Sequence, residues 1–278
     1  MKLGKLYFIL LCITLVTIQC KSDPKPKKTS DTPITSVVAP DFSGELAFDF
    51  IQKQVDFGPR VPGSEAHAEC ADWLAAKLDS FGAKVTVQKG QVERYDGKKL
   101  PMFNIVGSYN PSASKRILLC AHWDTRHVAD QGNERQQEPI LGANDGGSGV
   151  GVLLEVARQL QIKAPSAGVD IIFFDVEDQG QPDYVTPFKR DTYCLGSQYW
   201  AKNPHTPGYT AQNGILLDMV GAKDAVFTLE GTSMQFAPDF MRLVWDKAIQ
   251  LKHSKYFHYN RTAPVSYTHL TLPTKPSV

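Results

Sequence analysis

The sequence lacks three features: a large net charge, cysteines spaced for a zinc site, and an apolar run long enough to span a membrane. Lysine and arginine number 30 against 29 aspartate and glutamate residues, so the net charge is only +1 and gives no reason to expect a nucleic-acid partner. Cysteines number five in 278 residues, with no spacing typical of a cysteine zinc site. The apolar run of residues 6–16 is too short to span a bilayer stably. With 42% apolar and 21% charged residues, the chain is expected to fold around a packed core.

The N-terminus has the features of an export signal. Lys2 and Lys5 precede the apolar run of residues 6–16, and Cys20 follows it. This order resembles a bacterial lipoprotein signal, in which the cysteine is lipidated and begins the mature chain. A plain secretory signal is the alternative, because the residues just before Cys20 are larger than usual. We expect residues 1–20 to be a lipoprotein signal peptide that directs the protein across the inner membrane and anchors it by lipid in the cell envelope, on the periplasmic or the outer-membrane side.

Residues 21–40 resemble a tether. They hold four lysines, four prolines and almost no large apolar residue, so this segment cannot bury enough surface to fold. We expect a disordered linker here, followed by a folded domain over residues 41–265.

Three cysteines fall within that domain, Cys70, Cys120 and Cys194. At most one disulfide can join them, and the sequence does not choose the pair. Cys120 lies inside an apolar run, which favours a buried free thiol at this position.

Helical and strand patterns alternate from about residue 43 onward. Ser43 and Ser64 stand where they can cap helices, Gly82 can end the second helix, and Pro238 suits the first turn of a late helix. Continuous apolar runs indicate central strands covered on both faces. This alternation predicts an α/β fold with a single domain, in which a mixed, mostly parallel central sheet is flanked by helices. The expected strands are 85–88, 103–108, 117–121, 169–174 and 215–217, and the expected helices are 43–55, 64–81, 148–161 and one that begins at 238.

Polar residues follow several of the expected strands directly. His122, Asp178 and Asp218 each come at or just after the end of a strand, and Asp145 lies in a glycine-rich loop before a helix. Ligands of such sheets bind beyond the carboxyl ends of the strands, and imidazole together with carboxylates suits a catalytic zinc site. Glu177, next to Asp178, is then left free to move protons. Taken singly, each of these residues could instead be a helix cap, a turn residue or part of a surface ion pair.

The glycine-rich loop of residues 142–149 could also suggest phosphate binding. No Gly-Lys-Ser/Thr follows it, and Asp145 would repel a phosphate. We therefore interpret these glycines as allowing a close backbone approach at a strand-to-helix turn.

The histidines His67, His205 and His253 lie in helical or loop stretches away from this pattern. We expect them to be solvated or to cap helices rather than to bind metal.

Six segments form an ordered set: Phe57–Ser64, Cys120–Arg126, Gly142–Gly146, Phe173–Asp178, Cys194–Trp200 and Leu216–Gly221. As a set they resemble the zinc-dependent glutaminyl-peptide cyclotransferases of animals and bacteria, which share a fold with the zinc aminopeptidases. The resemblance covers about residues 43–264. It implies a zinc aminopeptidase-like fold and a peptide or protein substrate with a free N-terminus.

For a cyclotransferase, the resemblance implies that Asp145 and Asp178 bind one zinc ion and that Glu177 is the proton shuttle. Asp218 would help to hold the substrate amine or the proton network. Such an enzyme is an acyltransferase that converts an N-terminal glutamine to pyroglutamate and releases ammonia.

For an aminopeptidase, the same resemblance implies two zinc ions. His122, Asp145 and Asp218 would bind one of them, and Asp145, Asp178 and a late histidine would bind the other. Asp124 would orient His122 from behind. A third possibility is a non-catalytic cell-surface lipoprotein that binds peptides or metal, and the presence of a free carboxylate beside Asp178 argues against it.

The family pattern also implies that a histidine beyond residue 265 is the third zinc ligand. Residues 266–278 do not resemble that pattern, and we interpret them as a non-native tail, so His269 is not taken as the missing ligand. The chain as written is therefore expected to lack the third ligand, to fold poorly and to be inactive.

Overall fold

The first two helices begin at the serines that the sequence indicates as caps. In the computed structural model, which describes residues 40–262, Ser43 precedes α1 (Gly44–Asp56) and Ser64 precedes α2 (Glu65–Ser80). Each serine hydroxyl accepts a hydrogen bond from the backbone N–H three residues further on. This bond satisfies one of the donors that every helix start leaves without a helical partner.

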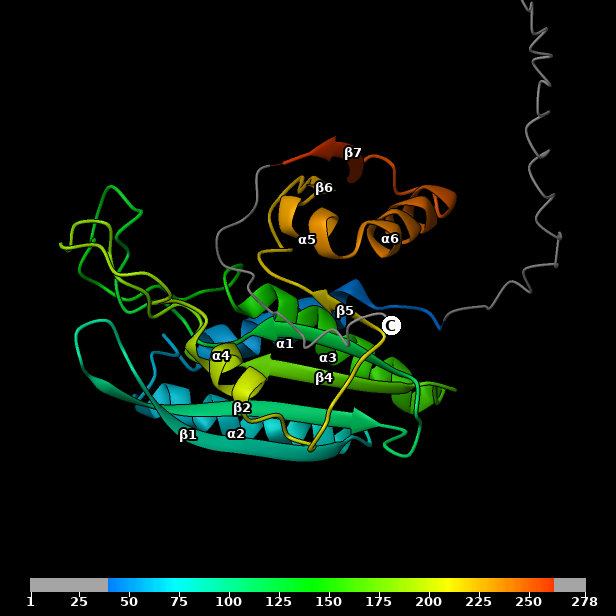
Figure 1. The fold of residues 1–278 in the computed structure, drawn as a ribbon, viewed down its shortest axis with the longest axis horizontal. Coiled ribbons are helices and arrows are strands. Elements are labelled where there is room, and N and C mark those ends of the chain that lie inside the picture. Colours follow the sequence, from blue (N-terminus) through cyan, green and yellow to red (C-terminus); the bar gives the residue numbers. More distant parts are fainter. Residues whose placement is uncertain (1–39, 263–278) are drawn as a thin grey trace, which may run out of the picture. The chain divides into compact units, whose positions relative to one another are not determined.

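Five strands form the central sheet in the order β1-β2-β4-β3-β5 (Figure 1). β2 pairs antiparallel with β1 and β4, whereas β3 pairs parallel with β4 and β5. Four of the five strands therefore run in one direction, and the predicted mixed, mostly parallel sheet is confirmed. The strands are β1 (Lys84–Glu93), β2 (Lys99–Tyr109), β3 (Arg116–His122), β4 (Gly168–Phe174) and β5 (Asn213–Leu216).

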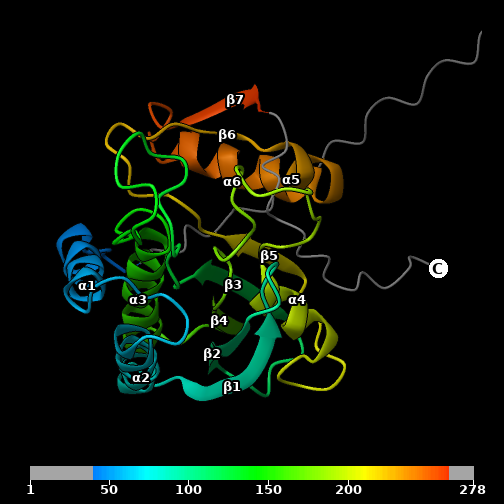
Figure 2. The same ribbon diagram turned by 90° about the vertical axis from the view of Figure 1, so that its left-hand side faces the viewer.

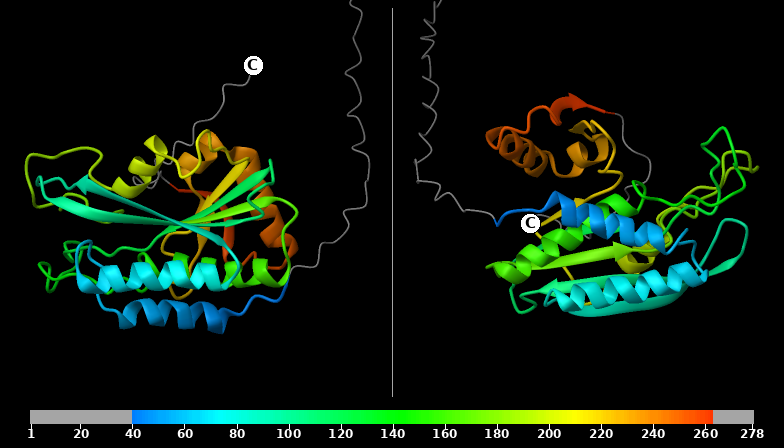
Figure 3. Two further views of the ribbon diagram at one scale, coloured as in Figure 1. Left: turned by 90° about the horizontal axis from the view of Figure 1, so that it is seen from below. Right: turned by 180° about the vertical axis from the view of Figure 1, so that it is seen from behind.

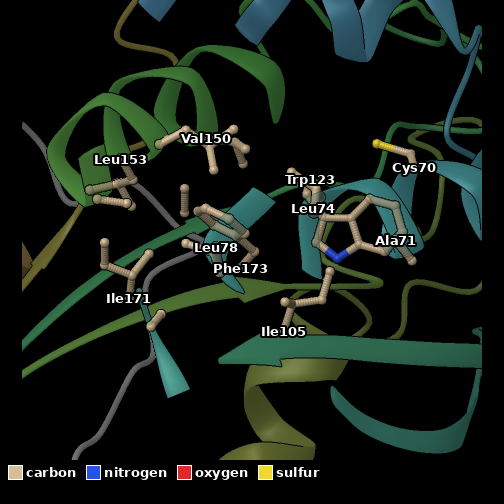
Figure 4. Close-up of a cluster of buried hydrophobic side chains, with 14 of the residues drawn as sticks. Cys70, Ala71, Leu74, Leu78, Ile105, Trp123, Val150, Leu153, Ile171 and Phe173 are labelled. Carbon is tan, nitrogen blue, oxygen red and sulfur yellow. The ribbon is translucent and has the colours of Figure 1, made fainter. Parts of the chain in front are cut away.

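Helices cover both faces of this sheet (Figures 2 and 3). On one face, α2 and α3 (Gly147–Ile162) pack against β2 and β4, and α1 packs against α3. Figure 4 shows side chains of α2, α3 and β4 meeting there, among them Leu74, Leu153 and Phe173. On the other face, α4 (Leu195–Lys202) places Trp200 against Phe174. Because β4 contacts both layers, all its residues are buried.

A smaller set of elements follows β5. β6 (Phe227–Leu229) pairs parallel with β7 (Phe257–Arg261), and α5 (Gly231–Phe236) and α6 (Pro238–Gln250) lie between them in sequence. Leu229, Met234 and Trp245 form their shared core. Pro238 occupies the first turn of α6 as predicted, whereas the short elements β6, α5 and β7 gave no periodic signal in the sequence.

One expected central strand lies elsewhere. Within residues 40–262, β5 is at the edge of the sheet, and its residues are half-buried or exposed. A run of only three apolar residues occurs in edge strands, which are covered on one face, as well as in central strands, which are covered on both. The run at residues 215–217 was therefore too short to distinguish an edge strand from a central one.

The predictions for the two ends of the chain concern residues that the structure does not describe. The signal peptide with Cys20, the tether up to residue 39 and the tail 266–278 lie outside the described residues. Among the helices of residues 40–262, none is both long enough and apolar enough to cross a bilayer. Of the described cysteines, Cys70, Cys120 and Cys194, none forms a disulfide, and the expected burial of Cys120 is confirmed.

A buried ion pair holds the start of β4. Asp170 is fully buried, and the guanidinium of Arg116 donates to its two carboxylate oxygens at 2.6 and 2.7 Å. The hydroxyl groups of Ser108 and Tyr209 also donate to it, at 2.6 and 2.9 Å. Burial opposes ionisation of Asp170, but these hydrogen bonds lower its pKa below the usual value.

We predict that Asp170→Asn lowers the free energy of unfolding by about 3 kcal/mol, because Arg116 then loses its buried counter-charge. Asp239→Asn is the matched control, since its partner Arg242 is on the surface and such pairs contribute less than about 1 kcal/mol.

The contribution of Asp170 to stability also depends on pH. Because its pKa is lowered in the folded state, ionised Asp170 stabilises the fold at pH values above its unfolded-state pKa of about 4. The difference between wild type and Asp170→Asn should therefore shrink as the pH falls below about 4, and urea unfolding at pH 7 and pH 3.5 tests both points. Equal losses in the two variants would contradict the prediction.

Candidate metal centre

The charged side chains gather at the carboxyl ends of three neighbouring strands. His122 ends β3, Glu177 and Asp178 follow β4, and Asp218 follows β5. β3 pairs parallel with both neighbours, so all three strands end at the same edge of the sheet. Asp145 reaches this edge from the loop before α3.

The structure brings His122, Asp145 and Asp218 together. The imidazole Nε2 of His122 lies 3.0 Å from Oδ1 of Asp145 and 3.5 Å from Oδ1 of Asp218. One potential ligand atom from each of the three residues lies within 4.8 Å of the others. This is the group that the aminopeptidase alternative assigns to one of its two ions.

Several buried atoms in this group lack hydrogen-bond partners within the described part of the chain. They are Nδ1 and Nε2 of His122, Oδ2 of Asp178 and Oδ1 of Asp218. Buried polar atoms are normally paired, so this cluster fits a bound cation better than a closed network. An imidazole and carboxylates without thiolates match zinc in a catalytic setting.

Asp178 belongs to the same acidic cluster. Its side chain is almost completely buried, and burial raises its pKa well above the usual value, with further repulsion from Asp145 and Glu177. Carboxylates held this close repel one another unless a cation or a proton lies between them. The two expected cyclotransferase ligands, Asp145 and Asp178, are thus electrostatically coupled. The histidine expected as third ligand, and His269, lie outside the described residues.

Glu177 is a half-buried carboxylate without a strong ion pair. Burial raises its pKa to about 7, His122 acts in the opposite direction, and Asp124 and Asp218 raise it further. Its Oε2 lies 3.9 Å from Nδ1 of His122. For His122, burial opposes the charged form, but Glu177 and the neighbouring aspartates raise its pKa well above the usual value. A carboxyl group with a pKa near neutrality can both accept and return a proton.

Asp124 fixes the loop that carries Glu177 and Asp178. It accepts hydrogen bonds from the backbone N–H groups of both residues, at 2.9 and 3.1 Å, and from the side-chain amide of Gln179 at 3.2 Å. Its distance to Nδ1 of His122 is 3.6 Å, which is longer than a hydrogen bond. The expected orientation of His122 by Asp124 stays a prediction, because the hydrogen bonds of Asp124 go to the loop after β4.

Gly146 allows the loop before α3 to approach His122. Its φ is +79°, and an added Cβ would lie 2.7 Å from the carbonyl oxygen of Asp124 and 3.2 Å from the imidazole ring. The predicted role of the glycines at this turn is therefore confirmed for Gly146.

Two residues that sequence reasoning missed secure the loop of Asp218. The side-chain oxygen of Asn144 accepts a hydrogen bond from the N–H of Gly221 at 2.8 Å, and the hydroxyl of Ser148 accepts one from Val220 at 2.9 Å. Asn144 precedes Asp145, so one short segment positions two of the acidic residues. The position of Asn144 next to the expected ligand Asp145 was the feature of the sequence that could have identified it.

Two buried arginines were also missed. Arg60 is fully buried and donates to the carbonyl oxygens of Trp123, Leu141 and Gly142, which ties the β3 end to the loop of Asp145. Arg126 donates to Asp130 and to the carbonyl and carboxylate oxygens of Asp178. Both arginines lie in segments that carried the family resemblance.

Of the two roles expected for His67, the solvated one is wrong, whereas at the start of α2 its Nδ1 accepts a hydrogen bond from the N–H of Gly63 at 3.5 Å. His67 is fully buried, stacks on Trp123 with ring centroids 4.6 Å apart, and contacts the Asp175 carboxylate at 2.9 Å. It lies in register with the buried residues Ala71, Leu74 and Leu78 of α2, and this spacing was the signal that places it inward.

The other two histidines lie away from the acidic cluster. His205 is half-buried, and its Nδ1 accepts a hydrogen bond from the indole N–H of Trp200 at 3.1 Å. His253 is exposed in the turn after α6, as expected of a solvated residue.

Known proteins with a similar sequence or structure point to one superfamily. The sequence pattern described as peptidase family M28 matches residues 104–267. Among solved structures, the glutaminyl cyclase of Tannerella forsythia is 52% identical, with a TM-score of 0.80 over 81% of this chain and 78% of its own. A Zn-dependent exopeptidase of Parabacteroides distasonis ATCC 8503 is 48% identical, with a TM-score of 0.83 over 84% of this chain and 81% of its own. These likenesses confirm the predicted fold.

A curated relative extends the comparison at lower identity. The glutaminyl-peptide cyclotransferase of Drosophila melanogaster is 27% identical over 180 residues, which are 61% of this chain and 46% of that protein. The chain thus spans about half the length of the curated relatives it matches.

We use 'full-length protein' for the protein in which the natural C-terminal sequence replaces residues 266–278. We predict that Asp145→Asn reduces the zinc affinity of this full-length protein by at least about 100-fold. Asp145 belongs to both expected zinc sites, and the substitution removes its charge. Asp239→Asn, on the exposed start of α6, should keep wild-type zinc. Zinc per protein molecule after dialysis against a graded chelator series measures the difference, and equal zinc in the two variants would refute the assignment.

Proposed function

Because this chain belongs to peptidase family M28, we propose that it is a zinc-dependent glutaminyl-peptide cyclotransferase, an acyltransferase that converts N-terminal glutamine of peptides to pyroglutamate and releases ammonia. The observation that carries the proposal is the 52% identity to the Tannerella forsythia glutaminyl cyclase over about four fifths of both chains. The half-buried carboxyl of Glu177 at the same edge of the sheet, whose pKa is raised to about 7 by burial, supports it.

The proposed reaction divides its work between zinc and the protein. Asp145 and Asp178 would hold the ion, which as a Lewis acid polarises the side-chain amide carbonyl of the substrate. Glu177 takes a proton from the attacking α-amine and gives it to the amide nitrogen, which leaves as ammonia. Since amine and carbonyl belong to one molecule, the attack is intramolecular, and the protein aids it further by holding the folded conformer of the substrate.

The solvent exposure of two of the acidic side chains is consistent with the proposed reaction. The side chains of Asp145 and Asp218 are about one-third exposed, at 33% and 31%, whereas His122 is 3% exposed. A substrate amine can therefore reach Asp218 from solvent, and Asp218 accepts it in the proposal. A single zinc ion is proposed for this reaction.

The second candidate function is that of a zinc aminopeptidase. The observation that favours it is the group of His122, Asp145 and Asp218, which would hold a second ion beside the one that Asp145 and Asp178 would hold. Glu177 would then take a proton from an attacking water instead of an amine. A non-catalytic peptide- or metal-binding lipoprotein is the third candidate, and the intact Glu177 counts against it.

The proposal includes features outside residues 40–262. A histidine other than His269 is proposed as the third ligand, and residues 266–278 are proposed to be foreign to the natural protein. Residues 1–20 are proposed as a signal peptide and Cys20 as the lipid attachment site in the cell envelope. The proposed partners are peptides or proteins with a free N-terminus and, through the lipid, the membrane, but no nucleic acid.

We predict that the full-length protein converts a peptide with N-terminal glutamine into a product lighter by one ammonia. Glu177→Gln should lower kcat by about 10²–10⁴-fold, because no side chain then carries the proton. Glu69→Gln, on the exposed face of α2, is the matched control and should keep wild-type kcat. Mass spectrometry of the peptide follows both variants. Release of a free N-terminal amino acid would show that the protein is an aminopeptidase instead. An unchanged peptide would contradict both enzymatic functions and leave the non-catalytic lipoprotein as the remaining candidate.

We predict that Cys20→Ser abolishes incorporation of an alkyne-tagged fatty acid in cells and moves the protein from the membrane to the soluble fraction, because serine cannot carry the thioether lipid. Cys70→Ser should keep the label, since Cys70 is buried in α2. Continued labelling of the Cys20→Ser protein would sink the proposed anchor.

A further inference from the structure

We propose that Cys194 is a positioning residue for the proton shuttle, holding one oxygen of Glu177 through a hydrogen bond from its thiol. This inference rests on the proposed function, in which Glu177 moves the proton. The Sγ atom of Cys194 lies 3.2 Å from Oε1 of Glu177, within reach of the weak donor that a thiol is. Seventeen residues separate the two in sequence, so the contact depends on the fold.

The backbone at Cys194 turns its side chain toward Glu177. Cys194 is the N-cap of α4 with φ 57° and ψ 32°, a left-handed conformation that non-glycine residues seldom adopt. Its side chain makes no capping hydrogen bond to the helix, although this is the position from which a short polar side chain usually caps. The unusual conformation therefore serves the contact with Glu177 rather than the helix.

Backbone hydrogen bonds fix this turn against the loop after β4. The N–H of Cys194 donates to the carbonyl of Glu177 at 2.8 Å, and the N–H of Leu195 donates to the carbonyl of Val176 at 3.0 Å. Main chain and thiol thus hold the same residue, and the separation between Cys194 and Glu177 cannot drift without breaking both bonds.

The next residues bring α4 close enough for these bonds. A Cβ on Gly196 would lie 2.0 Å from the carbonyl oxygen of Asp175, so only glycine permits this approach. Asn104 joins the two segments, because its amide donates to the carbonyl of Gly196 at 2.9 Å and its oxygen accepts from the N–H of Asp175 at 3.0 Å. The Cys-Leu-Gly sequence is explained by this docking.

The thiol assigns different tasks to the two oxygens of Glu177. Oε1 faces Cys194, whereas Oε2 faces His122 at 3.9 Å and is the oxygen left for proton transfer. Fixing one oxygen selects one rotamer of a side chain that otherwise has several, and such preorganisation raises the rate of the chemical step rather than substrate affinity.

The test compares Cys194→Ala, Cys194→Ser and the control Cys70→Ala in the full-length protein. Cys194→Ala should lower kcat about tenfold, the loss expected for one hydrogen bond to a charged group, with KM and zinc content unchanged. Cys194→Ser should recover most of kcat because its hydroxyl can donate to Glu177. Cys70→Ala, which removes a buried thiol from α2, should keep wild-type kcat. Equal losses in the alanine and serine variants, or no loss in either, overturn the proposal.

A second measurement does not depend on the reaction. Iodoacetamide labelling of Cys194, followed by peptide mass spectrometry, should be several-fold faster in Glu177→Gln than in wild type, because a neighbouring carboxylate disfavours the reactive thiolate. Equal labelling rates mean that the contact is absent and overturn the positioning role. If wild type neither cyclises nor hydrolyses peptides, the proposed function fails, while the labelling rates still decide whether Cys194 and Glu177 interact.

Discussion

Repulsion between carboxylates is the constraint around which the structure is arranged. Asp145, Asp178, Glu177 and Asp218 lie at one edge of the sheet with the imidazole of His122, and burial makes the negative charges of Asp178 and Glu177 more costly. A cation resolves this conflict, and the surrounding polar groups keep the carboxylates from turning away toward water. The hydrogen bonds that Asp124, Asn144 and Ser148 accept come from backbone groups of the loops that carry these acids. These bonds hold the loops and leave the carboxylate oxygens of the acids available to an ion.

Sequence patterns located the acidic residues because parallel strands end together. Once 117–121, 169–174 and 215–217 were interpreted as parallel strands, His122, Asp178 and Asp218 were expected at one edge of the sheet, and the parallel pairing of β3 with β4 and β5 brings the ends of these strands to one edge. The serines at the starts of α1 and α2 were equally predictable, because capping depends only on neighbouring residues.

The features that escaped prediction depend on partners far away in sequence. The hydrogen-bond partner of His67 is Asp175, more than a hundred residues later, and the edge position of β5 within residues 40–262 depends on which strands pair. Arg60 serves three carbonyl groups on segments about 60 to 80 residues away. Such hydrogen bonds have no periodicity, so a single sequence gives the residue type and the fold alone gives the partner.

Within residues 40–262, the edge position of β5 has a consequence for how this site can diversify. Glu177 and Asp178 follow β4, which is buried between two helical layers, so their backbone cannot shift without disturbing the core. Asp218 instead follows a short, half-buried strand, and its loop is held by side chains of the α3 segment. The Asp218 loop is therefore the part of the centre that can be remodelled while the fold stays intact.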